Sequence, residues 1–222
     1  MYYAGGKAKT FHHVINLIPP HDVYIEPFLG LGSVMRAKLP CRVEIGIDLD
    51  SRILHRSDLS ARPASLIHGD GIEFLEQYGF EGHEVVYCDP PYLPVTRKRS
   101  RVYRYDASEA DHRRFLELLV TIDANVLISG YDNVLYRDFL QSWNTYRFQA
   151  KSHNGLRDET IWYNFSRPKK LHDYRYLGQN YRERQTIRRR LERLKSRIRN
   201  LSDQELEHVY EWISSKRGDD AT

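Results

Sequence analysis

The sequence has few cysteines and no long apolar run. Only Cys41 and Cys88 are present among its 222 residues, too few for a disulfide framework or, without spaced histidine partners, for a four-ligand zinc site. We expect both to be reduced core residues. No stretch approaches the roughly 18 apolar residues that a membrane-spanning helix needs, and the first residues lack the apolar run of a secretory signal. These absences predict a soluble, cytoplasmic protein with no membrane partner.

The overall composition is that of a protein with one globular core. Hydrophobic residues make up 41% of the chain and charged residues 29%. This balance excludes a disordered chain, a collagen-like repeat and a coiled-coil rod.

Basic residues are concentrated in one segment. Residues 167–200 contain 13 Lys or Arg against 3 Asp or Glu, whereas residues 1–166 contain 19 against 21. A smaller basic run at residues 97–105 mixes cations with tyrosines, which suits a phosphate backbone with exposed bases. Taken alone, such a run is more often a solvated face.

Short apolar runs alternate with segments of helical periodicity up to residue 165. This alternation predicts an α/β fold in which helices cover both faces of a mainly parallel sheet. The last two strands are joined by only residues 151–159, too short for a crossover helix, so we expect them to pair as an antiparallel hairpin. We expect seven strands, at residues 23–26, 43–47, 65–68, 85–88, 125–129, 145–150 and 160–165, and helices at residues 10–18, 33–38, 51–59, 71–78, 108–122 and 133–142.

The pattern changes after Pro168. From residue 187 to residue 201, apolar residues recur at spacings of four and three among Arg and Lys, which predicts a basic amphipathic helix. A second helix, capped by Ser202 or Asp203, could fold back on it. We expect the apolar stripe to pack on the main domain rather than to form a dimer seam, because two helices give too few heptads.

Chemistry is expected beyond the carboxyl ends of the strands, where ligands of open parallel sheets bind. The first expected strand ends at Glu26, and Gly30 and Gly32 then let the backbone approach a ligand. The loop lacks the third glycine of the dinucleotide fingerprint and the Gly-Lys-Ser of a phosphate loop, so a pyrophosphate ligand is not favoured. Asp48 follows the glycine loop after about twenty residues, the sequence spacing at which an acid reaches the ribose hydroxyls of a bound nucleoside. A nucleoside-containing cofactor would fit this set.

Two nearby acids have alternative roles. Asp50 is expected to cap the helix that follows it. Asp70 ends the third strand, and its carboxylate could accept a hydrogen bond from an exocyclic amine or cap the helix that starts at Gly71. We weigh these two roles of Asp70 equally.

The fourth strand ends in the most specific tetrapeptide of the chain, Asp89-Pro90-Pro91-Tyr92. Its prolines remove two backbone donors and hold the chain in an extended bend. A carboxylate, a free carbonyl and an aromatic ring are thereby brought together, which suits a planar ring that bears an amine. A nucleobase flipped out of a duplex meets this description. The simpler alternative is a strand that ends at prolines with a tyrosine plug.

These motifs, in this order, resemble the Dam-type, alpha-group DNA adenine N6-methyltransferases, whose catalytic motif is Asp-Pro-Pro-Tyr. The resemblance covers nearly the whole chain and depends on the ordered occurrence of Tyr3-Ala4-Gly5-Gly6-Lys7, Glu26-Pro27-Phe28 with Gly30 and Gly32, Asp48, Asp70, Asp89 to Tyr92, residues 128–133 and residues 159–165. The tail from residue 171 onward is similar to that of compact phage-type members.

The resemblance implies a Rossmann-like methyltransferase domain at residues 1–168, followed by a basic helical extension at residues 169–222. It implies S-adenosylmethionine as cofactor and methyl transfer, without a metal, to adenine N6 in double-stranded DNA at a specific site. Catalysis is assigned to Asp89, Pro90, Pro91 and Tyr92. Cofactor contacts are assigned to Tyr3, Ala4, Lys7, Glu26, Phe28, Gly30, Gly32, Asp48, Asp70 and Asp89.

One departure from the family concerns sequence recognition. The family usually inserts a target-recognition domain before the tetrapeptide, yet only 19 positions separate Asp70 from Asp89. Recognition must then come from the loop at residues 93–105, the hairpin tip at residues 152–159 or the basic tail. We expect nucleic-acid contacts at Arg97, Lys98, Arg99, Arg101, Tyr103, Arg188 and Arg189.

Two other functions stay open. One is an adenine methyltransferase that acts on RNA, because the tetrapeptide recognises a base and not a sugar. The other is a noncatalytic nucleic-acid-binding module that keeps the fold. A homodimer and a restriction or phage partner are also left open.

Overall fold

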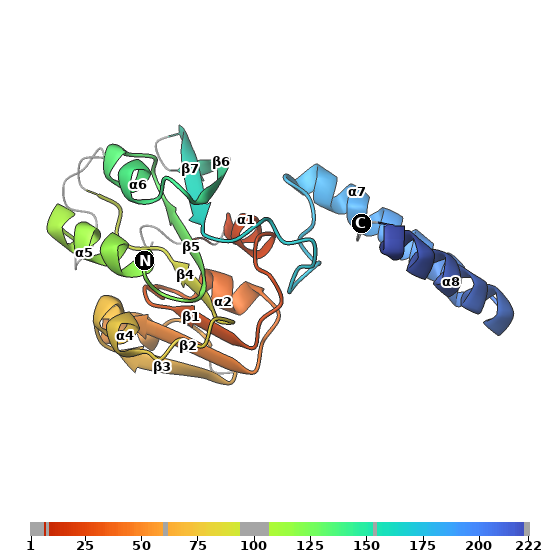
Figure 1. Cartoon of the computed structure of the whole chain (residues 1–222), viewed down its shortest axis with the longest axis horizontal. Coiled ribbons are helices and arrows are strands. Elements are labelled where there is room, and N and C mark those ends of the chain that lie inside the picture. The colour runs from red at the N-terminus through yellow and green to blue at the C-terminus, as the bar shows by residue number, and fades with distance from the viewer. Residues whose placement is uncertain (1–6, 8, 60–61, 94–106, 153–154, 220–222) are drawn as a thin grey trace. The chain divides into compact units, whose positions relative to one another are not determined.

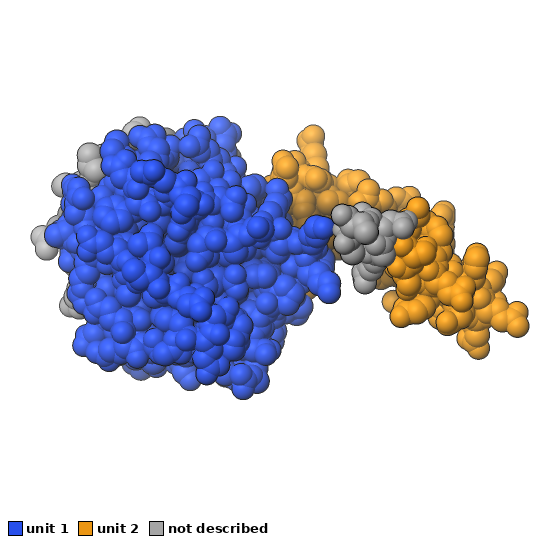
Figure 2. Space-filling view, viewed as in Figure 1, with its two compact units in different colours: residues 1–174 blue, residues 175–222 orange. Residues whose placement is uncertain are grey.

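In the computed structural model of this chain, residues 7, 9–59, 62–93, 107–152 and 155–219 are described. The chain forms two compact units, residues 1–174 and 175–222 (Figure 2). Residues 169–174, which the sequence assigned to the helical extension, lie in the first unit.

The first unit is built on a seven-stranded sheet of order β3-β2-β1-β4-β5-β7-β6 (Figure 1). All neighbours pair in parallel except β7, which is antiparallel to both β5 and β6. The predicted α/β fold with its terminal antiparallel hairpin is therefore confirmed. The strands are β1 (Val23–Glu26), β2 (Val43–Asp48), β3 (Ala64–His68), β4 (Val85–Cys88), β5 (Asn125–Gly130), β6 (Asn144–Ser152) and β7 (Gly155–Tyr163).

Helices cover both faces of this sheet. Helices α4, α5 and α6 lie on one side, with α1 and α2 on the other (Figure 1). The helices of this unit are α1 (Phe11–Ile15), α2 (Ser33–Ala37), α3 (Ser51–Leu54), α4 (Gly71–Gln77), α5 (Glu109–Leu119) and α6 (Val134–Phe139).

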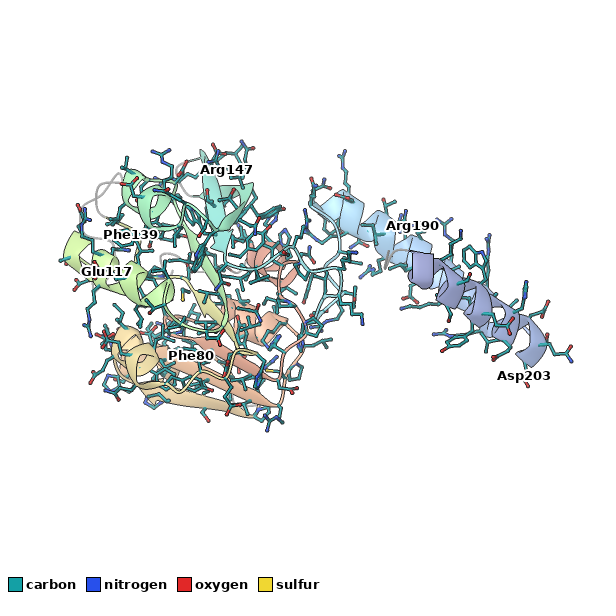
Figure 3. All side chains as sticks on the ribbon, in the orientation of Figure 1. Phe80, Glu117, Phe139, Arg147, Arg190 and Asp203 are labelled. Carbon is teal, nitrogen blue, oxygen red and sulfur yellow. The ribbon has the colours of Figure 1, made fainter. Side chains whose placement is uncertain are left out.

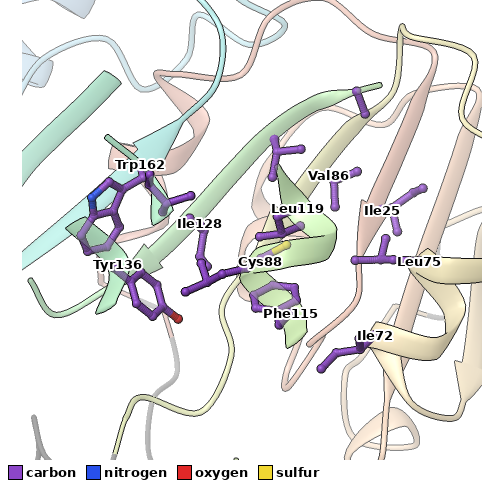
Figure 4. Close-up of a cluster of buried hydrophobic side chains, with 14 of the residues drawn as sticks. Ile25, Ile72, Leu75, Val86, Cys88, Phe115, Leu119, Ile128, Tyr136 and Trp162 are labelled. Carbon is purple, nitrogen blue, oxygen red and sulfur yellow. The ribbon is translucent and has the colours of Figure 1, made fainter. Parts of the chain in front are cut away.

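Burial explains the order of the strands. Every residue of β1 and β4 is buried, whereas most of β3 is exposed, as expected of central and edge strands in a parallel sheet with helices on both faces. The main apolar cluster joins Ile25, Val86 and Ile128 on the strands to Leu75 and Phe115 on α4 and α5 (Figure 4). Apolar burial of this kind is the main contribution to stability.

Several predicted boundaries are corrected by the structure. Strand β7 begins at Gly155, five residues before the predicted start, because the chain pairs with β6 to the end of the hairpin. The predicted tip at residues 152–159 is thus mostly strand. Helices α1, α3 and α6 are shorter than predicted. Cys88 is buried as expected, but Cys41 is half-buried.

The last residues of the first unit are tied to it by hydrogen bonds. The backbone N–H of His172 donates to the carbonyl of Ile18 at 3.0 Å. The carboxylate of Asp173, which is fully buried, accepts from the backbone N–H of Leu39 at 3.1 Å. Residues 172 and 173 therefore belong to the packed body of the first unit.

The second unit consists of two helices, α7 (Tyr181–Arg199) and α8 (Asp203–Asp219). They run in opposite directions, and Figure 3 labels Arg190 on α7 and Asp203 at the start of α8. Ser202 caps α8: its hydroxyl accepts from the N–H of Glu205, whose carboxylate accepts from the N–H of Ser202. No residue of α7 is buried. Among the described helices of the chain, none is both long and apolar enough to cross a membrane.

Candidate active site

The predicted site residues follow strands on both sides of the point where the strand order reverses. From β1 the chain moves outward through β2 and β3 and then returns to β4 on the other side of β1. Ligands of open α/β sheets bind at such a switch point, beyond the carboxyl ends of the strands. Glu26 ends β1, Asp48 ends β2 and Asp89 follows β4.

The carboxylate of Asp89 is held by a buried polar chain. Ser129 on β5 donates to its Oδ1 atom at 2.8 Å, and the Ser129 oxygen lies 3.0 Å from the hydroxyl of Tyr87. Oδ2 accepts no hydrogen bond from any described residue, and the Asp89 side chain is 17% exposed. Burial raises the pKa of Asp89, against the effect of nearby Lys7. Within the described ranges, the carboxylate is thus oriented through Oδ1.

Lys7 lies between two carboxylates at this centre. Its Nζ atom is 3.1 Å from Oδ1 of Asp89 and 3.1 Å from Oε2 of Glu159, and it donates a hydrogen bond to the hydroxyl of Tyr92. Burial alone would lower the pKa of Lys7, but the charges of Asp89 and Glu159 outweigh burial and raise it above its ordinary value. Lys7 is therefore a buried ammonium in direct contact with the tetrapeptide.

Tyr92 forms an aromatic group with Tyr131. Their rings meet edge to face with centroids 4.6 Å apart. Arg157 on β7 donates to the Tyr131 hydroxyl at 3.2 Å, and its guanidinium lies over the Tyr131 ring at 5.4 Å. Tyr92 itself is only 8% exposed. Little of the Tyr92 ring is therefore left uncovered for a further stacking partner.

A histidine is hydrogen-bonded to the second proline of the tetrapeptide. His112 on α5 lies with Nε2 3.0 Å from the carbonyl oxygen of Pro91 and Nδ1 3.0 Å from the hydroxyl of Tyr136. Because a carbonyl only accepts, Nε2 carries the hydrogen in this contact. The carbonyl of Pro91 is thereby occupied, whereas that of Pro90 receives no hydrogen bond from any residue in the described ranges.

The end of β1 provides a second buried acid. Oε1 of Glu26 accepts from the hydroxyl of Tyr24 at 2.7 Å and from the backbone N–H of Met35 at 2.9 Å. Burial raises the pKa of Glu26 to about 8, although both hydrogen bonds oppose that rise. Within the described residues no donor reaches Oε2, so a cationic group that reached this oxygen would restore the charge of Glu26.

The loop after β1 is shaped by its glycines. Gly30 and Gly32 have φ values of 52° and 62°, in the left-handed region that favours glycine. The N–H of Gly30 donates to Oδ2 of Asp48 at 2.8 Å, and the N–H of Asp50 donates to Oδ1 at 2.9 Å. Asp48 therefore orders the loop and, since a carboxylate accepts about four hydrogen bonds, retains capacity for hydroxyl groups.

The capping roles predicted for two acids are confirmed. Asp50 accepts from the N–H of Arg52 at the start of α3, and Asp70 accepts from the N–H of Ile72 at 2.7 Å at the start of α4. A ligand contact by Asp70 stays a prediction. Phe28 meets Phe115 edge to face at 5.1 Å, so this predicted cofactor residue packs on the core.

Together, these groups suit a ligand with an ammonium group and a ribose. Glu26 has an oxygen that no donor in the described ranges reaches, Asp48 has acceptor capacity for hydroxyls, and the glycine loop is hydrogen-bonded to Asp48. S-adenosylmethionine has both features, so the residues present fit the cofactor that the sequence predicted. No group of three or more His, Cys, Asp or Glu side chains that could hold a metal ion occurs in the described ranges.

Some predicted residues lie outside the described ranges or in the other unit. Tyr3, Ala4, Arg97, Lys98, Arg99, Arg101 and Tyr103 lie outside the residues that the structure describes. Arg188 and Arg189 are exposed on α7 in the second unit.

Three residues of the centre were not foreseen. Ser129 on β5 and Glu159 on β7 are buried polar residues, and His112 is a buried histidine on α5. Glu159 reaches the site because β7 is antiparallel to β5, with Thr160 opposite Gly130. Arg157 and Asp158 precede Glu159 on the same strand, so nothing in the sequence signals that Glu159 is the buried residue of the three.

One family model matches part of the chain. Residues 58–156 match the family model of the D12 class N6 adenine-specific DNA methyltransferases. This region contains Asp70 and the tetrapeptide but not Lys7, Glu26 or Asp48. None of the curated proteins matches the chain.

Solved structures show similarity at low sequence identity. A ribosomal RNA methylase from Streptococcus thermophilus is 13% identical, with a TM-score of 0.47 over 69% of this chain and 93% of that one. TrmK from M. capricolum, with S-adenosyl-homocysteine, is 9% identical, with a TM-score of 0.47 over 98% of this chain and 97% of that one. A magnesium protoporphyrin IX methyltransferase from Synechocystis is 13% identical, with a TM-score of 0.47 over 71% of this chain and 79% of that one.

These scores carry no conclusion about substrate. The family match is the informative comparison, because it names an activity and spans the tetrapeptide. The resemblance to the Dam-type adenine methyltransferases is thus confirmed over residues 58–156, which match a family of methyltransferases whose methyl donor is S-adenosylmethionine.

Proposed function

We propose that the chain methylates N6 of adenine in double-stranded DNA, at a base flipped out of the duplex and bound at Asp89. This proposal depends on which hydrogen-bond acceptors at the end of β4 already have a donor. Oδ1 of Asp89 is held by Ser129 and Lys7, and the carbonyl of Pro91 is held by His112. Among the described residues, no donor reaches Oδ2 of Asp89 or the carbonyl of Pro90, and we assign these two acceptors to the two hydrogens of an amine.

Two acceptors at one amine would change its reactivity. The lone pair of an adenine amine is delocalised into the ring, so the free amine is a weak nucleophile. Hydrogen bonds to Asp89 and Pro90 draw the nitrogen toward tetrahedral geometry and stabilise the positive charge that develops on it. S-adenosylmethionine, when bound, supplies a methyl group on a positively charged sulfur. Afterwards, Oδ2 of Asp89 can accept the proton that leaves the nitrogen.

Base flipping follows from the position of the amine. Inside a duplex the N6 group is paired and stacked, so an enzyme that reacts with it must extrude the nucleotide. Stacking on Tyr92 would help to offset that cost, since an aromatic contact contributes about 1 to 3 kcal/mol per base. The basic face of α7 supports a role in binding the phosphate backbone. Because the family match names DNA, we favour DNA over RNA as the substrate.

The proposal is tested by expressing the chain in a host without DNA methylation and sequencing the host DNA at single-molecule level. The expected result is N6-methyladenine at a fixed sequence motif. An Asp89→Ala protein produced at the same level serves as control and should leave the DNA unmodified. Unmodified DNA with the wild-type protein, or methylation that persists with Asp89→Ala, would contradict the proposal.

Two in vitro measurements separate the alternative functions. Methyl transfer to duplex DNA and to RNA of the same sequence distinguishes the two polymers. Calorimetry with S-adenosylhomocysteine distinguishes an enzyme from a noncatalytic binding module, because only the former requires a cofactor site.

A further inference from the structure

Glu159 is a buried acid that the motif comparison assigns to no role. It lies on β7, 8% exposed, and its Oε2 atom is 3.1 Å from Nζ of Lys7. Lys7 also touches Asp89 at 3.1 Å, so a single ammonium is shared by two carboxylates from β7 and from the end of β4.

The charges of this cluster do not balance. Tyr87 stays neutral because burial raises its pKa well above the ordinary value, and Ser129 has no charge. By residue type, the cluster has one basic group, Lys7, and two acidic groups, Asp89 and Glu159. Two buried carboxylates repel each other, and the side chains are only 6% to 17% exposed. A cluster that served stability alone would need only one acid for Lys7.

The excess negative charge has a use if an amine becomes cationic at Asp89. We infer that Glu159 is a positioning residue of the proposed methyl transfer. By sharing the Lys7 ammonium, it keeps that charge from neutralising Asp89 and leaves one net negative charge beside the target nitrogen. This inference rests on the proposed function, and it adds a residue outside the tetrapeptide that sets the charge of the site.

Charge and shape are separated by two substitutions at the same position. Glu159→Gln keeps the size and can still accept a hydrogen bond from Lys7 but removes the charge, whereas Glu159→Asp keeps the charge on a shorter side chain. Asp158→Asn is the matched control, because Asp158 is the adjacent acid on β7 and is exposed. Three quantities are measured: kcat for methyl transfer to unmethylated phage duplex DNA, the Kd of S-adenosylhomocysteine by calorimetry, and the rate of Lys7 acetylation by peptide mass spectrometry.

The expected result is a kcat about tenfold or more lower in Glu159→Gln, with the Kd of S-adenosylhomocysteine changed by less than about threefold. Lys7 should be acetylated faster in this variant, because loss of a counter-ion lowers its pKa. Glu159→Asp should recover part of the kcat, and Asp158→Asn should behave as wild type.

Three results would overturn the inference: a folded Glu159→Gln protein with wild-type kcat, a Glu159→Asp protein as slow as Glu159→Gln, or an unchanged rate of Lys7 acetylation. These are distinct from failure of the proposed function. A wild-type protein that transfers no methyl group refutes the proposed function and this inference with it, whereas an active wild type with an equally active Glu159→Gln refutes the inference alone.

Discussion

Ser129 donates a hydrogen bond of 2.8 Å to Oδ1 of Asp89. The serine is completely buried on β5, so its hydroxyl is fixed by the sheet and not by solvent. A rigid second residue of this kind is what holds a reactive carboxylate in one orientation.

Ser129→Ala should therefore lower kcat without weakening cofactor binding. A hydrogen bond to a charged group contributes about 1.5 to 3 kcal/mol, so we expect kcat to fall by roughly 10- to 100-fold. The measurement is kcat together with the Kd of S-adenosylhomocysteine. Tyr87→Phe is the control. It removes the hydroxyl that contacts Ser129 but keeps the hydrogen bond from Ser129 to Asp89, so kcat should fall less. Equal effects of the two substitutions would argue against a specific role for Ser129.

Tyr92 offers a test of base stacking. Tyr92→Phe keeps the ring but loses the hydroxyl that accepts from Lys7, whereas Tyr92→Ala loses the ring. If the ring holds the flipped base, Tyr92→Ala should weaken binding of target DNA by about 1 to 3 kcal/mol, and Tyr92→Phe should bind nearly as wild type. Fluorescence of 2-aminopurine at the target position reports both binding and flipping. If Tyr92→Phe is as defective as Tyr92→Ala, the hydroxyl and not the ring is the important group.

The sequence predicted the order of elements well because each strand is a short apolar run followed by turn residues. It also placed Glu26, Asp48 and Asp89 at one edge of the sheet, since strand ends follow directly from the parallel topology. The capping role of Asp50 at α3 could be predicted as well, because a helix cap is a local contact.

Long-range contacts could not be predicted in this way. Lys7 and Glu159 are 152 positions apart, and no periodicity indicates that they meet. The same holds for Arg62, which contacts the buried Glu44 at 2.6 Å although the two are 18 positions apart. Local pattern identifies which residues are polar, but only the packed sheet decides which of them share a buried charge.

Glu26 should make stability depend on pH. Its pKa is raised from an ordinary 4.5 to about 8 by burial, so the native state binds more protons than the unfolded state between these values. The free energy of unfolding should therefore fall as pH rises through this window, by up to about 1.4 kcal/mol per pH unit. Urea unfolding from pH 5 to 8 measures this slope. Glu26→Gln should flatten it, while Glu117→Gln, at an exposed position on α5 (Figure 3), should leave it unchanged.

The same acid predicts proton release on cofactor binding. If the ammonium of the cofactor pairs with Glu26, binding at pH 6 to 7 ionises the carboxyl group and releases up to one proton. Calorimetry of S-adenosylhomocysteine binding in two buffers of different ionisation enthalpy gives the number released. We expect release by the wild type and none by Glu26→Gln. Equal release by both proteins would show that another group titrates.

The arginines of α7 provide a test of backbone binding by the second unit. Arg188, Arg189 and Arg190 are exposed on a helix with no buried residue, so replacing all three by Ala should leave the melting temperature unchanged. If they contact phosphates, DNA affinity should fall and the slope of log K against log salt should decrease by about 0.9 for each lost contact. Arg42→Ala, at an exposed position beside the amino end of β2, is the control for removal of a surface charge and should keep the wild-type slope. An unchanged salt slope in the triple variant, with a lower melting temperature, would instead assign these arginines to packing.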